Sequence, residues 1–221
     1  MEKSDEMKIK IVGVGGCGCN YVDSMIEKKY LSEDEFIAID TYEHSLESSP
    51  AKYKIQIGAK VVQGLGAGAN PNKGKKAAEE DRDKIYNALE GSNIVFILAG
   101  LGGGTGTGAS PVIAEISKEI GAVTIAFVTK PFSYEGLKRK NSAESAIKNL
   151  SERVDAIKTI SNDSLLEVCN CDATLVEAFS LLGKYWIEGI NKISDHIVNS
   201  GNIKPEEVEA IMRNVGTDFG L

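Results

Sequence analysis

The stretch Gly102-Gly103-Gly104-Thr105-Gly106-Thr107-Gly108 is almost bare of side chains and lies between two hydrophobic segments. We expect it to connect a strand at Asn93 to Leu98 with a helix that begins near Ser110. Glycines allow positive φ angles and bring backbone amides close to a ligand, and the following helix adds unpaired N–H groups and a positive dipole end. The run therefore predicts a binding site for an anion such as phosphate.

The glycine run lacks the lysine that ends a P-loop, G-x-x-x-x-G-K-[ST]. Backbone amides, hydroxyl groups and a metal ion would therefore neutralise the phosphate charge. The alternative is a flexible linker, which requires a polar stretch that joins two domains. Apolar segments flank the run closely on both sides, and this favours a binding loop.

The chain has 221 residues, of which 42% are hydrophobic, and these values predict one globular domain over residues 1–221. Its formal net charge of -7 argues against binding to nucleic acid, which requires clustered Lys and Arg. The first residues, Met1 to Met7, lack an apolar core, and no segment is long enough to span a bilayer. We therefore expect a cytoplasmic protein with no direct membrane segment.

The four cysteines form two C-x-C pairs, Cys17 with Cys19 and Cys169 with Cys171. A zinc site is one interpretation, but structural zinc sites commonly use the wider C-x-x-C spacing. Free thiols are the expected state in a reducing compartment. We therefore expect no metal ion to be held by protein side chains.

Short β-rich runs alternate with longer helical patterns, which predicts an α/β fold around a mostly parallel sheet. The expected strands are Ile9–Val12, Glu35–Ile39, Lys54–Ile57, Asn93–Leu98, Ala122–Val128 and Ala156–Ile160. The expected helices are Cys17–Lys28, Lys75–Leu89, Ser110–Ile120, Leu137–Glu152, Ser164–Val168, Ala173–Val198 and Pro205–Val215. The longest, at about residues 173–198, carries apolar residues at helical spacing, which is typical of a core helix.

A second glycine loop, Gly13-Val14-Gly15-Gly16-Cys17-Gly18, matches G-x-G-x-x-G between a predicted strand and a predicted helix. Asp40 ends the next strand about twenty residues on, where a dinucleotide-binding unit contacts its ribose. An NAD-dependent oxidoreductase is therefore one interpretation. A third glycine-rich segment, Gly64 to Pro71, also precedes a predicted helix, and a triphosphate makes better use of three such loops.

The run Gly102 to Gly108 resembles the tubulin signature, and the chain is similar to members of the tubulin/FtsZ superfamily, closer to FtsZ, over nearly its whole length. The resemblance implies a three-layer, Rossmann-like nucleotide-binding fold with a mostly parallel sheet, with GTP or GDP as ligand and Mg²⁺ as cofactor. The phosphate-binding residues that it implies are Gly15, Gly16, Cys17, Asn20, Gly68, Ala69, Asn70, Gly102, Gly103, Gly104, Thr105, Gly106 and Thr107.

Thr129-Lys130-Pro131-Phe132 and the residues after it resemble the ribose-side loop of the family. By that resemblance Glu135 accepts hydrogen bonds from ribose hydroxyls, and Arg139 lies beside the sugar and phosphates. The alternative for Glu135 is a solvated helix N-terminus, where a carboxylate is favoured by the helix dipole.

Ser161 to Leu166 resembles the base-reading loop, with Asn162 contacting the purine and Phe179 stacking on the base. In FtsZ a carboxylate or amide follows this aromatic by one helical turn and helps to select guanine. Here that neighbourhood is Gly183-Lys184, and lysine can only donate to the base. Base selection at Gly183 therefore departs from the family pattern.

After the long helix, FtsZ carries an Asn-x-Asp-x-x-Asp pattern that reaches the nucleotide of the neighbouring subunit. The corresponding segment here, Asn199 to Glu207, is shorter and has no aspartate. The resemblance implies that Glu207 orients the attacking water, with Lys204 as a cation that stabilises charge. The alternative is that Pro205, Glu206 and Glu207 only form a favourable first helical turn.

The resemblance implies a self-assembling cytoskeletal GTPase whose active site is completed between subunits. The shortened loop keeps open a second interpretation, a GTP-binding assembly protein with little or no hydrolysis. The sequence ends where the second, activation domain of FtsZ and tubulin begins, so we expect that domain to be absent. The sequence alone does not distinguish a naturally short protein from part of a longer one.

Overall fold

The computed structural model describes residues 7–29, 35–168 and 174–219. Its sheet has six strands in the order β3-β2-β1-β4-β5-β6, and each neighbouring pair is parallel. The strands are β1 (Ile9–Val14), β2 (Phe36–Asp40), β3 (Tyr53–Gln56), β4 (Ile94–Gly100), β5 (Val123–Lys130) and β6 (Ala156–Ser161). The predicted α/β fold is confirmed, with a sheet that is parallel throughout these pairs.

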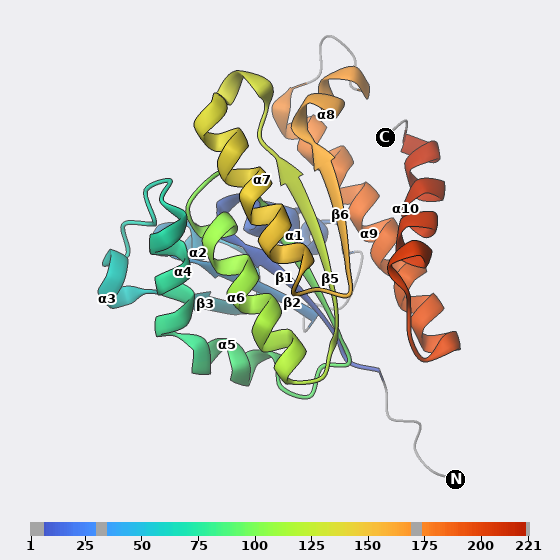
Figure 1. Cartoon of the computed structure of the whole chain (residues 1–221), viewed down its shortest axis with the longest axis horizontal. Coiled ribbons are helices and arrows are strands. Elements are labelled where there is room, and N and C mark those ends of the chain that lie inside the picture. The colour runs from blue at the N-terminus through green and yellow to red at the C-terminus, as the bar shows by residue number, and fades with distance from the viewer. Residues whose placement is uncertain (1–6, 30–34, 169–173, 220–221) are drawn as a thin grey trace.

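Helices cover both faces of the sheet and give three layers (Figure 1). One face packs against α1 (Gly15–Glu27), α2 (Glu43–Ser48), α8 (Asn162–Val168), α9 (Leu175–Ser200) and α10 (Pro205–Phe219). The other packs against α4 (Pro71–Glu80), α5 (Arg82–Leu89), α6 (Thr105–Glu119) and α7 (Leu137–Ser151). Short α3 (Ala59–Val62) and a 3₁₀ turn (Ser133–Glu135) lie in connections.

Strand β4 lies in the middle of this arrangement and is buried on both sides. Ile94, Phe96 and Leu98 belong to the core under α1 and α9, whereas Val95, Ile97 and Ala99 belong to the core under α6. Side chains alternate between the two faces of a strand, so a central parallel strand must be apolar at every position. This explains the continuous hydrophobic run before the glycine stretch.

The strand order changes direction between β1 and β4, which lie next to each other. One half of the sheet grows from β1 toward β3, and the other from β4 toward β6. In open parallel sheets, the loops at such a point diverge and leave a crevice at the carboxyl ends of the strands. The loops that follow β1 and β4 are the first glycine loop and the glycine run, so the topology brings them to one crevice.

The predicted helix Lys75–Leu89 is two helices in the structure, separated at Asp81. The buried Asp81 carboxylate accepts a hydrogen bond of 2.7 Å from the backbone N–H of Gly58, far away in sequence. That contact holds Asp81 at φ -107° and ψ 27°, which is outside the helical range. The helix also begins earlier than predicted, at Pro71, because the Asn70 side chain caps it and proline suits the first helical position.

Two other helices also begin earlier than predicted, inside their glycine loops. Helix α6 begins at Thr105 instead of Ser110, and α1 begins at Gly15 instead of Cys17. The long helix α9 covers Leu175–Ser200 and is preceded by Thr174, which accepts a hydrogen bond from the Glu177 N–H. The glycine loops therefore supply first helical turns as well as turns of irregular backbone.

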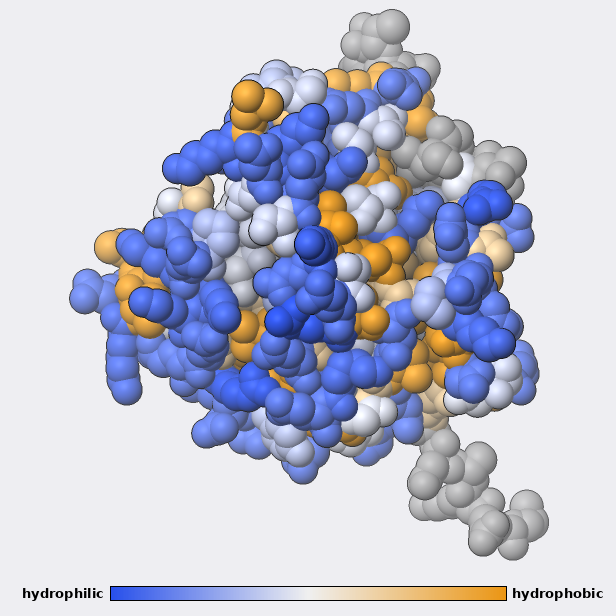
Figure 2. Space-filling view, viewed as in Figure 1, coloured by the Kyte–Doolittle hydropathy of each residue, from blue (hydrophilic) through white to orange (hydrophobic). Residues whose placement is uncertain are grey.

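Hydrophilic residues cover most of the face on which α4, α5, α6 and α7 lie (Figure 2). Among the described residues, no helix combines the length and the hydrophobicity that crossing a bilayer requires.

Candidate functional site

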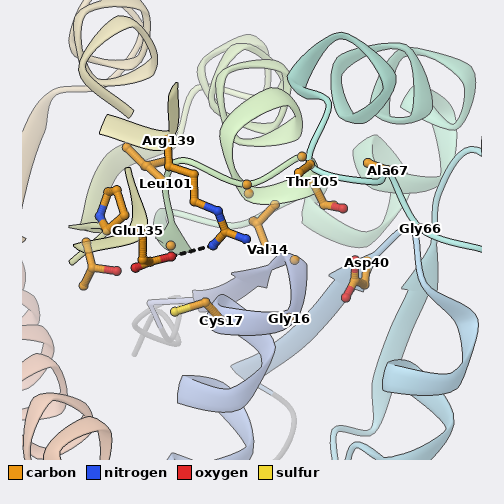
Figure 3. Close-up of a pocket in the computed structure, with 18 of the residues that line it drawn as sticks. Val14, Gly16, Cys17, Asp40, Gly66, Ala67, Leu101, Thr105, Glu135 and Arg139 are labelled. Atoms are coloured by element: carbon orange, nitrogen blue, oxygen red, sulfur yellow. Dashed lines mark hydrogen bonds and ion pairs between the residues drawn. The ribbon is translucent and has the colours of Figure 1, made fainter. Parts of the chain in front are cut away.

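A cavity of about 670 Å³ opens at the carboxyl ends of β1, β2, β4 and β5 (Figure 3). Val14, Asp40, Gly100 and Thr129 line it at the ends of these four strands. The cavity brings together most of the residues that the sequence singled out. Those that line it are Gly15, Gly16, Cys17, Gly68, Ala69, Gly103, Gly104, Thr105, Gly106, Glu135, Arg139, Asn162 and Phe179.

Two helix N-termini meet in the lining of the cavity. Neither α1, preceded by Val14, nor α6, preceded by Gly104, has a side chain that caps its first N–H groups. They lie so close that a methyl group on Gly15 would be 2.8 Å from the Gly106 nitrogen. Unpaired N–H groups and positive dipole ends are therefore concentrated in one place, which favours an anion.

The third glycine segment forms one wall of the cavity with very little side-chain volume. Gly66, Gly68 and Ala69 have φ angles of 81°, 59° and 55°, the left-handed conformation that glycine adopts most readily. A non-glycine residue in this conformation is uncommon, so Ala69 is held by its neighbours. Asn70 does not line the cavity, because its side-chain oxygen accepts the Asn72 N–H at 3.0 Å and caps α4.

The residues of the glycine run divide into two groups. Gly103, Gly104, Thr105 and Gly106 line the cavity, whereas Gly102 and Thr107 do not. The Gly102 N–H donates to the Thr107 hydroxyl at 2.9 Å, and Thr107 is buried. The second pair therefore ties the two ends of the loop together.

Charged side chains at the cavity are few. Arg139 is the only Lys or Arg among the described residues that line it, and it forms an ion pair with Glu135 (Figure 3). The other Glu135 oxygen accepts the Phe132 N–H at 2.8 Å. An anion in this cavity would therefore be neutralised largely by backbone amides.

Aromatic rings gather at the end of the cavity that holds Arg139 and Glu135. The Phe132 and Tyr134 rings are 5.0 Å apart and nearly parallel, and Phe179 meets Phe132 edge to face at 6.3 Å. Asn162 lies in the same lining and is 8% exposed, and its buried side-chain oxygen has no hydrogen-bond partner in the described part of the chain. A buried acceptor without a donor is costly unless a ligand supplies one.

Cys17 and Cys19 are free thiols. Burial raises the pKa of the Cys17 thiol, and burial also raises the pKa of the Cys19 thiol well above its ordinary value. The Cys19 sulfur donates weakly to the carbonyl oxygens of Gly13 and Ile39. Cys169 and Cys171 lie outside the described residues. In the described part of the chain, no three His, Cys, Asp or Glu side chains are grouped to hold a metal ion.

Asp40 ends β2, as predicted, but its carboxylate is engaged by its own loop. One oxygen accepts the Thr41 N–H at 2.7 Å and the other accepts the Ser45 hydroxyl at 2.8 Å. The carboxylate that a dinucleotide-binding site needs for the ribose is therefore occupied in shaping the β2–α2 connection.

Asn20, Gly183, Lys204 and Glu207 lie outside the cavity lining. Asn20 lines a neighbouring hollow of about 540 Å³ next to Cys17. Gly183 faces α1, where an added methyl group would lie 3.7 Å from the Ser24 hydroxyl oxygen.

Lys204 lies in the connection between α9 and α10, and Glu207 lies in the first turn of α10. Figure 1 shows this junction at the C-terminal end of α9. One Glu207 oxygen accepts the Lys204 N–H at 2.7 Å, as a helix cap does, and the other lies 3.6 Å from the His196 Nε2 atom.

Sequence reasoning did not single out Thr41 and Tyr42 as site residues, although both line the cavity. They follow Asp40 at the carboxyl end of a parallel strand, and that position was the available signal. Gly66, Ala67, Phe132 and Tyr134 were recognised only as parts of longer segments.

A parallel sheet with its crevice at the strand reversal, lined by glycine loops and helix N-termini, defines the class of Rossmann-like α/β domains. The family model described as "Tubulin/FtsZ family, GTPase domain" matches residues 8–170 of this chain. The chain belongs to the tubulin/FtsZ family.

Solved structures agree with this assignment. An empty FtsZ dimer from M. jannaschii superimposes with a TM-score of 0.77 at 39% sequence identity, over 85% of this chain and 54% of that chain. A GTPγS-bound protofilament of CetZ2 from Haloferax volcanii superimposes with a TM-score of 0.74 at 23% sequence identity, over 85% of this chain and 58% of that chain. This similarity shows a shared fold. The chain thus spans little more than half the length of these proteins.

Proposed function

We propose that the chain binds a guanine nucleotide, GTP or GDP, in this cavity. The composition of the lining carries the proposal: two uncapped helix N-termini and an unpartnered buried amide oxygen belong to one cavity. The first feature suits a phosphate chain and the second suits the N–H groups of a base. The volume of about 670 Å³ is in the usual range for nucleotide-sized ligands.

In this proposal the phosphates contact the amides of the three glycine loops, including Gly16, Ala69 and Gly104. Glu135 accepts from the ribose hydroxyls, and Arg139 lies beside the sugar and phosphates. Phe179 stacks on the base, and the Asn162 oxygen accepts a hydrogen bond from the 2-amino group of guanine, a position at which adenine has no amino group. Gly183 offers no side chain to the base, so the selection of guanine depends on Asn162.

Mg²⁺ fits this site as a phosphate-bound ion. Magnesium keeps several waters and commonly binds through substrate phosphates, so it does not need a cage of carboxylates. When bound, it would neutralise the negative charge that develops on the phosphate oxygens while the terminal phosphoryl group is transferred to water.

We also propose that the chain self-associates head to tail and completes a GTPase site between subunits. From Phe179 to Ser200, α9 extends about 30 Å at 1.5 Å per residue, so Glu207 cannot reach the cavity of its own molecule. A neighbour stacked along α9 would bring Glu207 to that cavity as the residue that orients water, with Lys204 beside the phosphates. This would be a cytoplasmic, filament-forming protein in which residues 1–221 act as one nucleotide-binding domain.

A second candidate is a GTP-binding assembly protein that hydrolyses GTP slowly or not at all. The observation that favours it is the Glu207 cap, because a carboxylate that accepts the Lys204 N–H is already used within its own helix. An oxidoreductase that uses NAD has less support, since Asp40 is engaged by Thr41 and Ser45.

Nucleotide binding is tested by thermal unfolding with GTP, GDP, ATP or NAD. A ligand that binds only the folded state at one hundred times its Kd stabilises it by about 2.7 kcal/mol. We expect GTP and GDP to raise the melting temperature and ATP and NAD to have much smaller effects. A shift with NAD alone would contradict the proposal, and equal shifts with GTP and ATP would contradict guanine selection.

A further inference from the structure

Two buried threonines form a hydroxyl pair beside the cavity. The Oγ1 atoms of Thr41 and Thr105 are 2.6 Å apart, although 64 positions separate the residues in sequence. Thr41 is 0% exposed and Thr105 is 8% exposed. At this distance one hydroxyl donates a hydrogen bond to the other. The direction of that bond decides which of the two hydroxyl hydrogens is left to donate to a ligand.

The direction of this hydrogen bond follows from the need of each hydroxyl hydrogen for an acceptor. Each threonine hydroxyl has one hydrogen to donate. The Thr41 hydroxyl contacts no other acceptor among the described residues, so its hydrogen is satisfied only if it points at Thr105. In the opposite direction, the fully buried Thr41 hydrogen would be left without an acceptor, which costs about 1–3 kcal/mol.

The Thr105 hydrogen is then free, and its surroundings place it at the phosphate end of the cavity. Thr105 is the first residue of α6 and lines the cavity together with Gly15 and Gly66. In Figure 3 it lies between Val14 and Ala67, away from the Arg139–Glu135 pair. A hydroxyl that already accepts one hydrogen bond is also a stronger donor in the next.

Thr41 is itself held in place by two hydrogen bonds. Its N–H donates to the Asp40 carboxylate at 2.7 Å, and its hydroxyl is paired with that of Thr105. The β2–α2 connection and the start of α6 are therefore joined at this one residue. The pair is preformed before any ligand arrives, so little ordering is needed on binding.

We propose that Thr41 is a positioning residue that fixes the Thr105 hydroxyl as a donor to a phosphate oxygen of the bound nucleotide. This inference rests on the proposed nucleotide binding and assigns a task to a residue outside the predicted phosphate contacts. Thr41 lies in the cavity lining but is 0% exposed, so it acts through the more exposed Thr105.

The test is a double-mutant cycle in which Kd for GTP and for GDP is measured by calorimetry. Thr105→Val removes the donor and should weaken binding about tenfold to a hundredfold, as for a hydrogen bond to a charged group. Thr41→Val keeps the shape but frees the Thr105 hydroxyl to turn, and should weaken binding about threefold to tenfold. The double variant should bind no more weakly than Thr105→Val alone, because Thr41 acts only through Thr105.

Two further variants separate positioning from a structural role. Thr41→Ser restores the hydroxyl and should restore the wild-type Kd, whereas a purely structural role would leave the Thr41→Ser and Thr41→Val proteins alike. If Thr41→Val does not fold, Thr41→Ala enters the same cycle. Losses that add in the double variant, or a wild-type Kd in Thr41→Val, overturn the inference. No binding by the wild-type protein overturns the proposed function, and the inference with it.

Discussion

At the scale of single residues, Asn162 gives the sharpest test of ligand binding. Its buried side-chain oxygen has no partner in the described protein, so removing it costs the free protein no hydrogen bond. We expect Asn162→Ala to leave the melting temperature of the free protein unchanged or slightly raised. Its affinity for GTP should fall about tenfold or more, because the base donor then loses its acceptor. Calorimetric titration with GTP measures the second effect.

The matched control is Asn72→Ala, which alters an exposed asparagine outside the cavity. It should bind GTP as the wild type does. If Asn162→Ala retains full affinity, or loses stability without losing affinity, Asn162 is a structural residue and the base-reading role is wrong.

Asp23 provides a test based on pH. Burial raises the pKa of this carboxyl above its ordinary 3.8, and a hydrogen bond donated by Ser49 partly offsets the effect. A raised pKa means that the folded state binds the proton of Asp23 more tightly than the unfolded state does. Protonated Asp23 therefore contributes its full stabilisation at pH values below the pKa of the unfolded state. This stabilisation is lost as pH rises through the pKa of the folded state. At neutral pH the ionised group therefore destabilises the fold.

Asp23→Asn keeps an acceptor for Ser49 and removes the charge. We expect the variant to melt above the wild type at neutral pH and to approach it near and below pH 3.8, so the difference grows with pH. Paired thermal melts across this range measure the difference. A difference that does not vary with pH would show that desolvation of Asp23 does not contribute.

At the scale of elements, glycines decide how helices pack as well as where a ligand sits. Helix α4 lies backbone to backbone on α6, since a methyl group on Gly108 would be 2.0 Å from the Pro71 carbonyl oxygen. A methyl group on Gly103 meets no atom within 4 Å. Two residues of the same run are therefore glycine for different reasons, one for packing and one for open space at the cavity.

Gly108→Ala and Gly103→Ala are therefore a matched pair. Gly108→Ala should reduce the free energy of unfolding by about 1–3 kcal/mol or more, because rigid backbone has to move. Gly103→Ala should change it by less than about 0.5 kcal/mol and should weaken GTP binding, since its methyl group enters the cavity. Denaturant unfolding and calorimetry measure the two effects, and equal unfolding free energies for both variants would refute the distinction.

At the scale of the whole molecule, the length of α9 separates the cavity from the first turn of α10, which carries Glu207. If Glu207 completes the GTPase site, it acts on a neighbour, and the rate of GTP hydrolysis per molecule must rise with protein concentration. Phosphate release measured over a wide concentration range, with light scattering in GTP and in GDP, tests this. A rate per molecule that stays flat, or is undetectable throughout, removes the shared site and leaves the second candidate function.

Glu207→Gln separates catalysis from capping in the same assay. The amide oxygen still accepts the Lys204 N–H and keeps the cap, but glutamine cannot act as a base. We expect about a hundredfold slower hydrolysis with assembly retained, and wild-type hydrolysis in the exposed control Glu206→Gln. Glutamine can still orient a water through its amide oxygen, so Glu207→Ala is measured as well. Unchanged hydrolysis in both variants would assign this residue to the helix cap alone.

The local pattern of the sequence determined the elements and their order. Apolar runs such as Ile94–Leu98, followed by glycine loops and helical spacing, predicted the strands, the parallel sheet and the crevice, because each depends on residues close together in the chain. The glycine patterns predicted three binding loops, and the resemblance to the family added the role of Asn162. The break at Asp81 was not predicted, since its cause is the distant Gly58 N–H.

Only the tertiary structure decided what each glycine and hydroxyl contacts. It separated Gly103 at the cavity from Gly108 under α4, paired Thr41 with Thr105, and left the Asn162 oxygen without a partner. These contacts join positions that local propensity does not connect, and they depend on shifts of a few tenths of an ångström in packed backbone. A sequence pattern records which conformations a segment prefers, whereas the partners of a buried polar group are known only when the chain has closed around it.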